Sequence, residues 1–228
     1  MSDDDGSPRF PDTPDDLATR LAALRQPAGD ATEAARRRLA ATLRQINQAL
    51  VGARHQADAL SAAADRAEAV LDALGRPEAP ADHGDYVNHS PIVGLANPVA
   101  PPVEMWLEGD RVLGRAVLGD AYEGPPDHVH GGFVAAMLDE VLGYVQSLGG
   151  NPGMTGRLNV AYRAPTPLHR TLRLEAWVER VDGRKTHTKA TIHDGDRLCA
   201  EADGLFVAIG REAFEAMAAD KARRRAGS

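Results

Sequence analysis

The chain has 228 residues, of which 43% are hydrophobic and 26% are charged, as in soluble globular proteins with one good core. Its formal net charge of −7 supplies no overall basic field, which argues against nucleic acid as a partner. No apolar run reaches the roughly 18 residues of a membrane span, and the acidic start, MSDDDGSPRF, is unlike a secretory signal. We therefore expect a cytoplasmic protein that does not contact a membrane.

The front of the chain divides into a lead and a helical segment. Residues 1–30 are rich in Asp, Pro and Gly, a composition typical of a flexible lead. Over 31–75, apolar or small residues recur in steps that alternate four and three, which predicts one helix or two in register, with a weak spot at Gly52. These seam residues are Leu39, Leu43, Ile46, Leu50, Ala53, Ala57, Leu60, Ala64, Ala67, Leu71 and Leu74. The seam fits a hairpin packed on its own domain and an intersubunit coiled coil about equally well.

Two segments rich in proline separate this helical part from the rest of the chain. The stretch GRPEAPADHGD ends the helix and makes 76–85 a linker. Residues 86–102 contain four prolines and are expected to form a loop. The runs VEMWL and RVLGRAVL then flank EGD, which predicts a hairpin around Gly109.

The second half of the chain combines one apolar helix with a series of strands. The helix is predicted from Gly132 to about residue 148, where GGNPG ends it. Four extended runs follow, at 155–163, 171–181, 185–193 and 197–209. The segments DGR and DGD, each containing the Asp-Gly pair that is typical of tight turns, separate the last three runs. Residues 211–228 are expected to form a short helix and a basic tail, which carries Lys221 and the arginines at 223–225.

The order of these elements predicts the fold class. A hairpin, one apolar helix and a meander of antiparallel strands make an α+β chain, in which the helix covers the buried face of the sheet. A single helix wrapped by a curved antiparallel sheet is the hotdog arrangement. We expect this domain over residues 86–210, with residues 31–75 as a helical extension.

The start of the apolar helix has the properties of a site that stabilises negative charge. The first turn of a helix carries N–H groups without an internal partner, together with partial positive charge. Gly131 and Gly132 lie there and have no Cβ, so a carbonyl oxygen can approach closely and its oxyanion can be stabilised. The alternative is that the two glycines only turn the chain.

The middle of the same helix carries two adjacent acids, Asp139 and Glu140, among apolar residues. Burial in such surroundings would raise the pKa of a carboxyl group and suit it to act as a base near neutral pH. The two side chains point roughly 100° apart, and the pattern does not choose between them. Asp139 lies seven residues beyond Gly132, which is about 10 Å along the axis. We therefore expect a dimer in which each glycine end lies near the partner's acid.

A recognisable order of motifs runs through three segments, which are HVHGGFVAAMLDEVLG, MTGRLNVAYRAPTPL and VDGRKTHTKATIHDGDRLCAEADGLFV. They contain His-Gly-Gly, an acid in the helix, a threonine that opens the next strand and Tyr-x-x-Pro at its end. This order resembles the hotdog acyl-CoA thioesterases of the phenylacetate-pathway type, including the human thioesterase-superfamily branch. The resemblance implies hydrolysis of acyl-CoA thioesters to free acid and coenzyme A. It also implies a homodimer or dimer of dimers, with coenzyme A as part of the substrate and no cofactor.

The resemblance assigns roles to five residues. His130, Gly131 and Gly132 match the His-Gly-Gly loop, where a backbone N–H polarises the thioester carbonyl. Asp139 matches the acid that acts as general base or nucleophile, which implies Asp139 rather than Glu140. Thr155 matches the threonine that helps to hold the attacking water. His130 has two alternatives, a general acid for the leaving thiolate or a group that holds the loop by hydrogen bonding to backbone, and we favour the second.

Basic residues near the surface are candidates for holding the phosphates of coenzyme A. These are Arg163, Arg184 and Lys185, and their alternative role is that of ordinary solvated charges. The single cysteine, Cys199, is expected to be a small core residue. His187 and His193 are expected at the surface or rim of a strand, and no His/Cys spacing predicts a metal site.

Other functions compete with hydrolysis. One is a hydratase-like hotdog enzyme, and another is a non-catalytic hotdog protein that binds acyl groups or coenzyme A and assembles through its helical arm. A coiled-coil assembly protein is a further alternative, supported by residues 31–75 alone.

Overall fold

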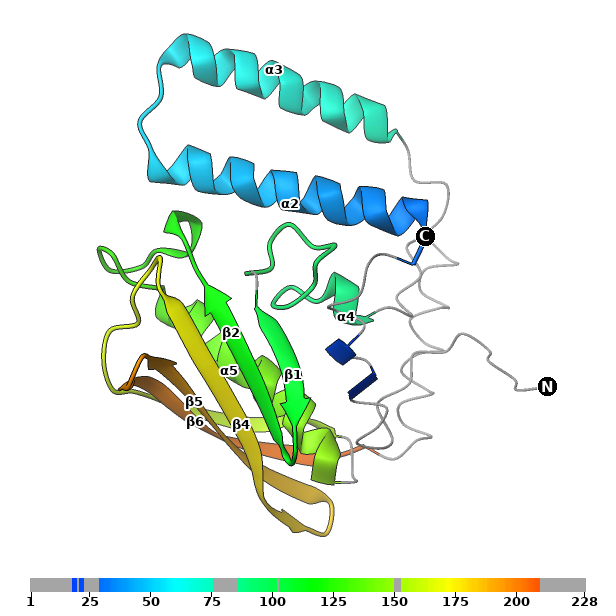
Figure 1. Ribbon diagram of the computed structural model, residues 1–228, viewed down its shortest axis with the longest axis vertical. Coiled ribbons are helices and arrows are strands. Elements are labelled where there is room, and N and C mark those ends of the chain that lie inside the picture. Colours follow the sequence, from blue (N-terminus) through cyan, green and yellow to red (C-terminus); the bar gives the residue numbers. More distant parts are fainter. Residues whose placement is uncertain are drawn as a thin grey trace, which may run out of the picture.

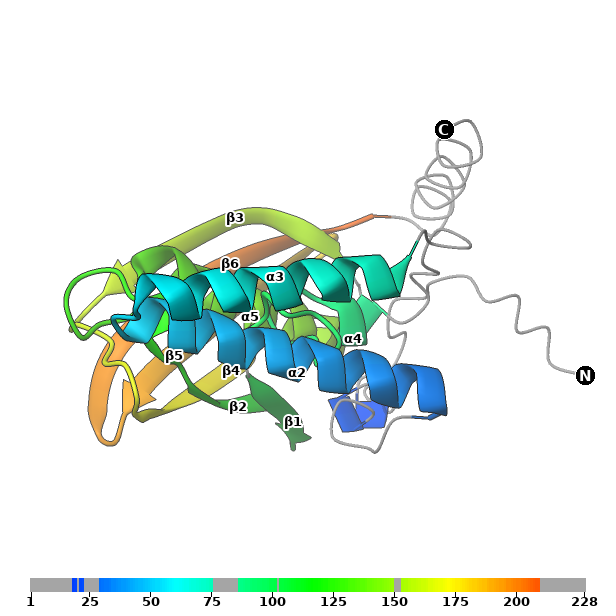
Figure 2. The same ribbon diagram turned by 90° about the horizontal axis from the view of Figure 1, so that it is seen from above.

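The protein is described by a computed structural model that places residues 18–19, 21–22, 29–75, 86–101, 103–149 and 153–209. Six strands form one antiparallel sheet in the order β1-β2-β4-β5-β6-β3, and the sheet curves around the helix α5 (Gly131–Val145; Figures 1 and 2). The strands are β1 (Glu104–Glu108), β2 (Arg111–Val117), β3 (Gly153–Tyr162), β4 (Thr171–Asp182), β5 (Lys185–Asp194) and β6 (Arg197–Ala208). The predicted α+β hotdog arrangement is confirmed.

The tight turns between strands follow from the glycines in the sequence. Gly183 begins the turn between β4 and β5 with φ +56°, and Gly195 does the same between β5 and β6 with φ +59°. A residue with a Cβ is strained at such angles, so a glycine in each position favours the hairpin. The hairpin predicted around Gly109, where β1 turns into β2, also forms.

The core lies between α5 and the inner face of the sheet. Alternate residues of β4, among them Leu172, Leu174 and Ala176, are buried against the helix. On α5 the buried residues are Val134, Met137, Leu138, Val141, Leu142, Tyr144 and Val145. Cys199 is completely buried, as expected of a small core residue. This packing holds α5 rigidly and fixes where its two acids and its glycine end lie.

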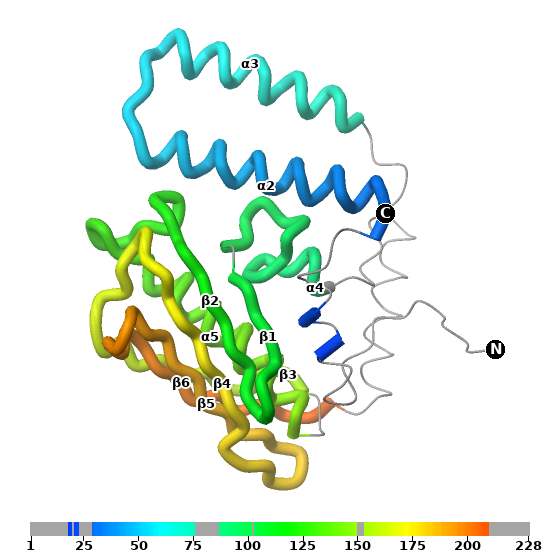
Figure 3. Tube along the Cα trace, in the orientation of Figure 1, coloured from blue at the N-terminus to red at the C-terminus, as the bar shows by residue number. Residues whose placement is uncertain are grey.

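The helical segment forms two helices, α2 (Ala31–Gly52) and α3 (Ala57–Leu74), with the break at the predicted weak spot Gly52 (Figure 3). Helix α2 rests on the short 3₁₀ turn η1 (Asp120–Tyr122). Helix α3 runs back alongside α2 and has no buried residue. A single continuous helix is therefore excluded, and α3 does not pack into the domain core. None of the helices in the described ranges is long and apolar enough to cross a membrane.

Two expectations for the loop-like segments need correction. Within residues 1–30, expected to be flexible, Ala18, Thr19, Leu21 and Ala22 are helical, and Leu21 is only 1% exposed because its side chain joins the core. Within 86–102, expected to be loop, one helical turn forms, α4 (Tyr86–His89). Leu17, Leu21 and Leu24 recur in steps of four and three, which is a helical signal, but the prediction followed the Asp, Pro and Gly content of the lead instead. The predicted linker at 76–85 and the predicted helix and tail at 211–228 lie outside the described residues.

Candidate active site

The start of α5 is closed by the histidine that precedes its two glycines. His130 occupies the N-cap position, and its Nδ1 accepts a hydrogen bond from the Gly132 N–H at 3.0 Å. A Cβ on Gly132 would lie 3.1 Å from this Nδ1, so glycine allows the close approach of the ring. The His130 side chain thus holds the loop to the helix, and the Gly132 amide is occupied by it.

The other amide of this turn points away from protein partners. Within the described ranges, no atom accepts a hydrogen bond from the Gly131 N–H. The Gly131 carbonyl accepts a hydrogen bond from the Tyr162 hydroxyl at 2.9 Å, which ties the first turn of α5 to the end of β3. Gly131 therefore offers a free N–H whose orientation is held on both sides, by His130 before it and by Tyr162 on its carbonyl.

Sequence reasoning assigned no role to Tyr162, although its motif was noticed. Tyr162 is the tyrosine of the Tyr-x-x-Pro pattern that ends the strand. Its side chain is 56% exposed, which is unusual for a large aromatic residue on a strand next to a helix start. The contact with Gly131 spans 31 residues of sequence, and no local pattern predicts such a pairing.

The predicted acid and the predicted threonine are in contact. The Thr155 hydroxyl donates a hydrogen bond to Asp139 Oδ1 at 3.1 Å. Thr155 lies near the start of β3, whereas Tyr162 and Gly131 lie at the end of this strand. Helix α5 consequently runs antiparallel to β3, and one chain places its acid and its free amide toward opposite ends of the same strand.

The second acid of the helix has a different environment from the first. Glu140 Oε1 accepts a hydrogen bond of 2.8 Å from the hydroxyl of Ser90, which comes from the loop after α4. Burial raises the pKa of Glu140 to about 7, the Ser90 hydrogen bond works in the opposite direction, and the charge of Asp139 adds a smaller increase. We expected burial to raise the pKa of the acid that serves as base, and the resemblance assigned that role to Asp139. In the structure, burial raises the pKa of its neighbour Glu140. The reason is the roughly 100° between successive side chains, which turns Asp139 toward β3 and Glu140 toward the loop.

The three basic candidates lie at opposite ends of the sheet edge. Arg163 follows the end of β3 and pairs with Glu201, to which its Nε donates at 2.9 Å. Arg184 lies in the turn between β4 and β5, Lys185 is the first residue of β5, and the Arg184 guanidinium donates to the Ala208 carbonyl at 2.8 Å. Because Ala208 pairs with Gly153 at the start of β3, these two residues lie near the acid end.

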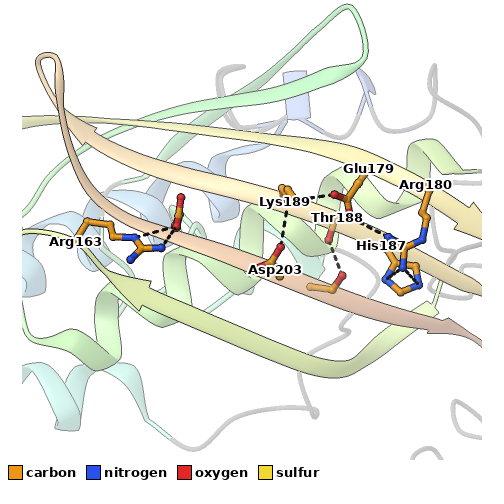
Figure 4. A network of polar contacts seen from close by, with 9 residues as sticks. Arg163, Glu179, Arg180, His187, Thr188, Lys189 and Asp203 are labelled. Atoms are coloured by element: carbon orange, nitrogen blue, oxygen red, sulfur yellow. Dashed lines mark hydrogen bonds and ion pairs between the residues drawn. The ribbon is translucent and has the colours of Figure 1, made fainter.

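The outer face of the sheet carries a separate network of charges, which Figure 4 shows. Lys189 contacts Glu179 at 3.1 Å and Asp203 at 3.6 Å, and the Arg180 guanidinium lies 3.3 Å from the ring nitrogens of His187. The Lys189 partnership lowers the pKa of Glu179. His187 is partly exposed on a strand, as predicted, and so is His193. In the described part of the chain, no three His, Cys, Asp or Glu side chains converge as metal ligands would.

Comparison with known proteins gives this geometry a context. The family model described as thioesterase superfamily matches residues 127–201, which include the whole of α5. Among curated proteins, the acyl-coenzyme A thioesterase THEM4 of Xenopus laevis is 39% identical over 95 residues, or 40% of this chain and 42% of that protein. THEM4 of Bos taurus is 32% identical over 96 residues, or 41% of this chain and 39% of that protein. The chain thus matches about two fifths of the length of these relatives.

A solved structure matches far more of the chain. It is a crystal structure described as that of a thioesterase superfamily protein, with 34% sequence identity and a TM-score of 0.71. The match covers 79% of this chain and 92% of that one. The structural match therefore includes residues outside 127–201, the region that the family model matches.

Proposed function

The chain belongs to the thioesterase superfamily, and from this premise we propose that it hydrolyses acyl-CoA thioesters to a free acid and coenzyme A. The observation that carries the proposal is the pair of groups on α5. A carboxylate held by a threonine and a backbone N–H without a protein partner are the two groups that thioester hydrolysis needs. The curated relatives named as acyl-coenzyme A thioesterases support the same substrate class.

Asp139 acts on water in the proposed reaction. Its carboxylate removes a proton from a water molecule that Thr155 helps to hold, and the resulting hydroxide adds to the thioester carbonyl carbon. The Thr155 hydroxyl fixes the orientation of the carboxylate through its hydrogen bond to Oδ1. The tetrahedral intermediate then breaks its C–S bond, and the coenzyme A thiolate takes up the proton that Asp139 removed.

Gly131 supplies the amide that stabilises the oxyanion. The Gly132 N–H is engaged by His130, whereas the Gly131 N–H has no acceptor among the described residues. An amide held in place before the substrate arrives needs no reorganisation during the reaction. His130 serves as the cap that holds this turn, and Tyr162 orients the Gly131 peptide through its carbonyl.

A dimer brings the two groups to one thioester. β3 is an edge strand with an exposed backbone edge, and most of its side chains are exposed as well. Antiparallel pairing of β3 with the β3 of a second copy would place the start of one strand beside the end of the other. The partner's Asp139 and Thr155 would then lie near Gly131, and each dimer would contain two such composite sites.

The same pairing gathers the basic candidates. Arg163 lies at the amide end of its own β3, and Arg184 and Lys185 lie at the acid end. In the antiparallel dimer, Arg163 would approach the partner's Arg184 and Lys185. We propose that these three residues hold the phosphates of coenzyme A, with Arg163 exchanging Glu201 for a phosphate.

Release of free thiol from acyl-CoA substrates tests the activity. We expect wild-type turnover, loss of turnover in Asp139→Asn, and retention in Glu140→Gln as the matched control on the neighbouring position. Equal activity of Asp139→Asn and wild type would remove the site assignment. No turnover of aliphatic or phenylacyl thioesters by wild type would favour a non-catalytic protein that binds them.

Mixed dimers test the composite site. Gly131→Pro removes the amide and is compatible with the helix, because proline is favoured at the first helical position and His130 already has φ −58° and ψ 132°, which suits a residue before proline. Equimolar mixing of Gly131→Pro with Asp139→Asn should restore about a quarter of wild-type activity, since half of the dimers then hold one intact site of two. Mixtures that remain as inactive as the separate variants would refute the shared site.

A further inference from the structure

The α2–α3 arm (residues 31–75) presents an apolar surface that the other described residues of its own chain leave uncovered. Of the twelve large hydrophobic residues that are exposed in the described part of the chain, seven belong to these two helices. They are Ile46, Leu50, Val51, Leu60, Val70, Leu71 and Leu74. Five of the seven are members of the seam with alternating steps of four and three, so the exposed surface is an ordered stripe.

The opposite side of α2 is anchored to the domain. Ala40 is 3% exposed, the Arg44 guanidinium donates to the Asn97 carbonyl at 2.8 Å, and the Gln48 side-chain oxygen accepts from the Ala121 N–H at 3.2 Å. Burial lowers the pKa of Arg44, which is consistent with a docked face. With this face occupied, the seam side of α2 at Ile46 and Leu50 points away from the domain.

Helix α3 lacks even such an anchor. None of its 18 residues is buried, and its N-cap residue Gln56 makes no capping hydrogen bond through its side chain. Most helical stability in proteins comes from packing an amphipathic face against a partner. Its regular helix therefore points to a partner other than the residues that the structure places in this chain.

The two helices have opposite charges. Helix α2 carries four arginines and one glutamate, for a net charge of +3, and α3 carries four acids and one arginine, for −3. The basic cluster at Arg36 and Arg38 lies in the first half of α2, whereas Glu68 and Asp72 lie in the second half of α3. Antiparallel packing of an α2 on an α3 would bring these halves together.

We propose that the arm docks against the arm of a second copy, with α2 of each chain packed on α3 of the other. The chain's own α3 already runs antiparallel to α2 (Figure 3), yet five large seam residues of the two helices remain exposed, so it does not fill this role. A twofold axis between two arms creates two identical contacts, each between the basic α2 of one chain and the acidic α3 of the other. The four helices then form an antiparallel bundle that buries the seam residues.

This interface is independent of the catalytic edge. Helix α2 rests on η1 and on the loop at Leu95 and Asn97, whereas β3 rests on β6 and α5. The inference goes beyond the proposed activity and does not depend on it. Together with pairing through β3, the arm would join two dimers into a tetramer, and without that pairing it would make a dimer.

Charge reversal in the full-length chain tests the proposal through the mass in solution. One variant carries Arg36→Glu and Arg38→Glu, and the other carries Glu68→Lys and Asp72→Lys. Each variant alone places like charges on both helix pairs and should have half the wild-type mass. An equimolar mixture restores both pairings between different chains and should return to the wild-type mass. The matched control, Glu108→Lys with Asp110→Lys, changes the charge of exposed residues at the β1–β2 turn and should leave the mass unchanged.

A hydrophobic variant makes the test independent of charge. Leu71→Lys with Leu74→Lys alters exposed seam residues of α3 without touching the core, so the domain should fold and the mass should halve. Wild-type mass in the charge-reversed or the seam variants would overturn the proposal. So would halved masses that mixing does not restore, because charge pairing within each chain predicts that outcome.

Discussion

Helices α5 and α3 both have an apolar face, yet α5 lies in the core of the protein and α3 has no buried residue. Helix α5 buries seven of its 15 residues because a curved sheet surrounds it, whereas α3 buries none of its 18. The comparison teaches that periodicity in a sequence reveals an apolar face, while burial depends on what the fold brings against that face. On α5 itself, Asp139 is a candidate for the chemistry, whereas buried residues such as Leu142 stabilise the fold.

The largest expected effect concerns Asp139, on the side of α5 that faces β3. Asp139→Asn should lower kcat by about 10²–10⁴-fold, the contribution typical of a positioned general base, with little change in stability. Thiol release and thermal unfolding measured on the same preparation check both parts. A large loss of stability would show that Asp139 holds the fold, and would weaken its assignment as the base.

A matched pair of truncations tests the difference between the helices directly. Leu142→Ala on α5, where the side chain is 0% exposed, should reduce the free energy of unfolding by about 2–5 kcal/mol. Leu71→Ala on α3, where it is 68% exposed, should change it by less than about 0.5 kcal/mol at protein concentrations that keep arms apart. Denaturant titrations give both values, and similar losses at the two positions would contradict the exposed placement of α3.

The pH dependence of stability should carry the signature of Glu140. Its pKa is raised by burial from 4.5 to about 7, so the folded protein binds more protons than the unfolded chain between these values. The stabilisation is therefore complete below pH 4.5 and is lost as pH rises through about 7, with a total on the order of 3 kcal/mol. Glu140→Gln should flatten this slope.

Asp72→Asn on the exposed helix α3 is the control for that measurement, since it removes a carboxylate without touching the core. Unfolding free energies at several pH values between 4 and 8 should show the Glu140→Gln curve alone departing from wild type. A difference in stability between wild type and Glu140→Gln that stays constant across this interval would contradict the raised pKa of Glu140.

The smallest effect is expected at the contact between β3 and the start of α5. Tyr162→Phe removes the hydrogen bond to the Gly131 carbonyl and keeps the ring. The net free energy that one such hydrogen bond contributes is about 0.5–1.5 kcal/mol. We expect kcat to fall by roughly 3–10-fold with KM nearly unchanged, because the amide is needed most in the transition state. A change in KM alone would indicate that Tyr162 contacts bound substrate and does not orient the amide.

Much of the fold was predictable because the relevant interactions are local. The turns at Gly183 and Gly195, the apolar run of α5 and the alternation along β4 each depend on a few neighbouring residues. The break between α2 and α3 fell at the weak spot Gly52 for the same reason. Leu21 was missed because the prediction followed the Asp, Pro and Gly content of the lead, although Leu17, Leu21 and Leu24 have helical spacing.

The candidate site was predictable in its members and less so in its contacts. The motif order named Asp139, Thr155 and the glycines, and the structure brings Asp139 and Thr155 into contact. The division of labour between the two amides was not predictable, since it depends on the His130 ring reaching the Gly132 N–H. Tyr162 reaches Gly131 across 31 residues, and only the folded chain brings these two together.

The sequence by itself determined which segments are helix, strand and turn, and which residue types carry the chemistry, because propensity and periodicity act over a few residues. The tertiary structure decided that Glu140 has the buried environment and Asp139 the edge of β3, since one step along a helix turns a side chain by roughly 100° toward a different neighbour. It also decided that α5 is enclosed and α3 is exposed. Both helices have an apolar face, but only a sheet folded from distant strands can cover one of them within a single chain.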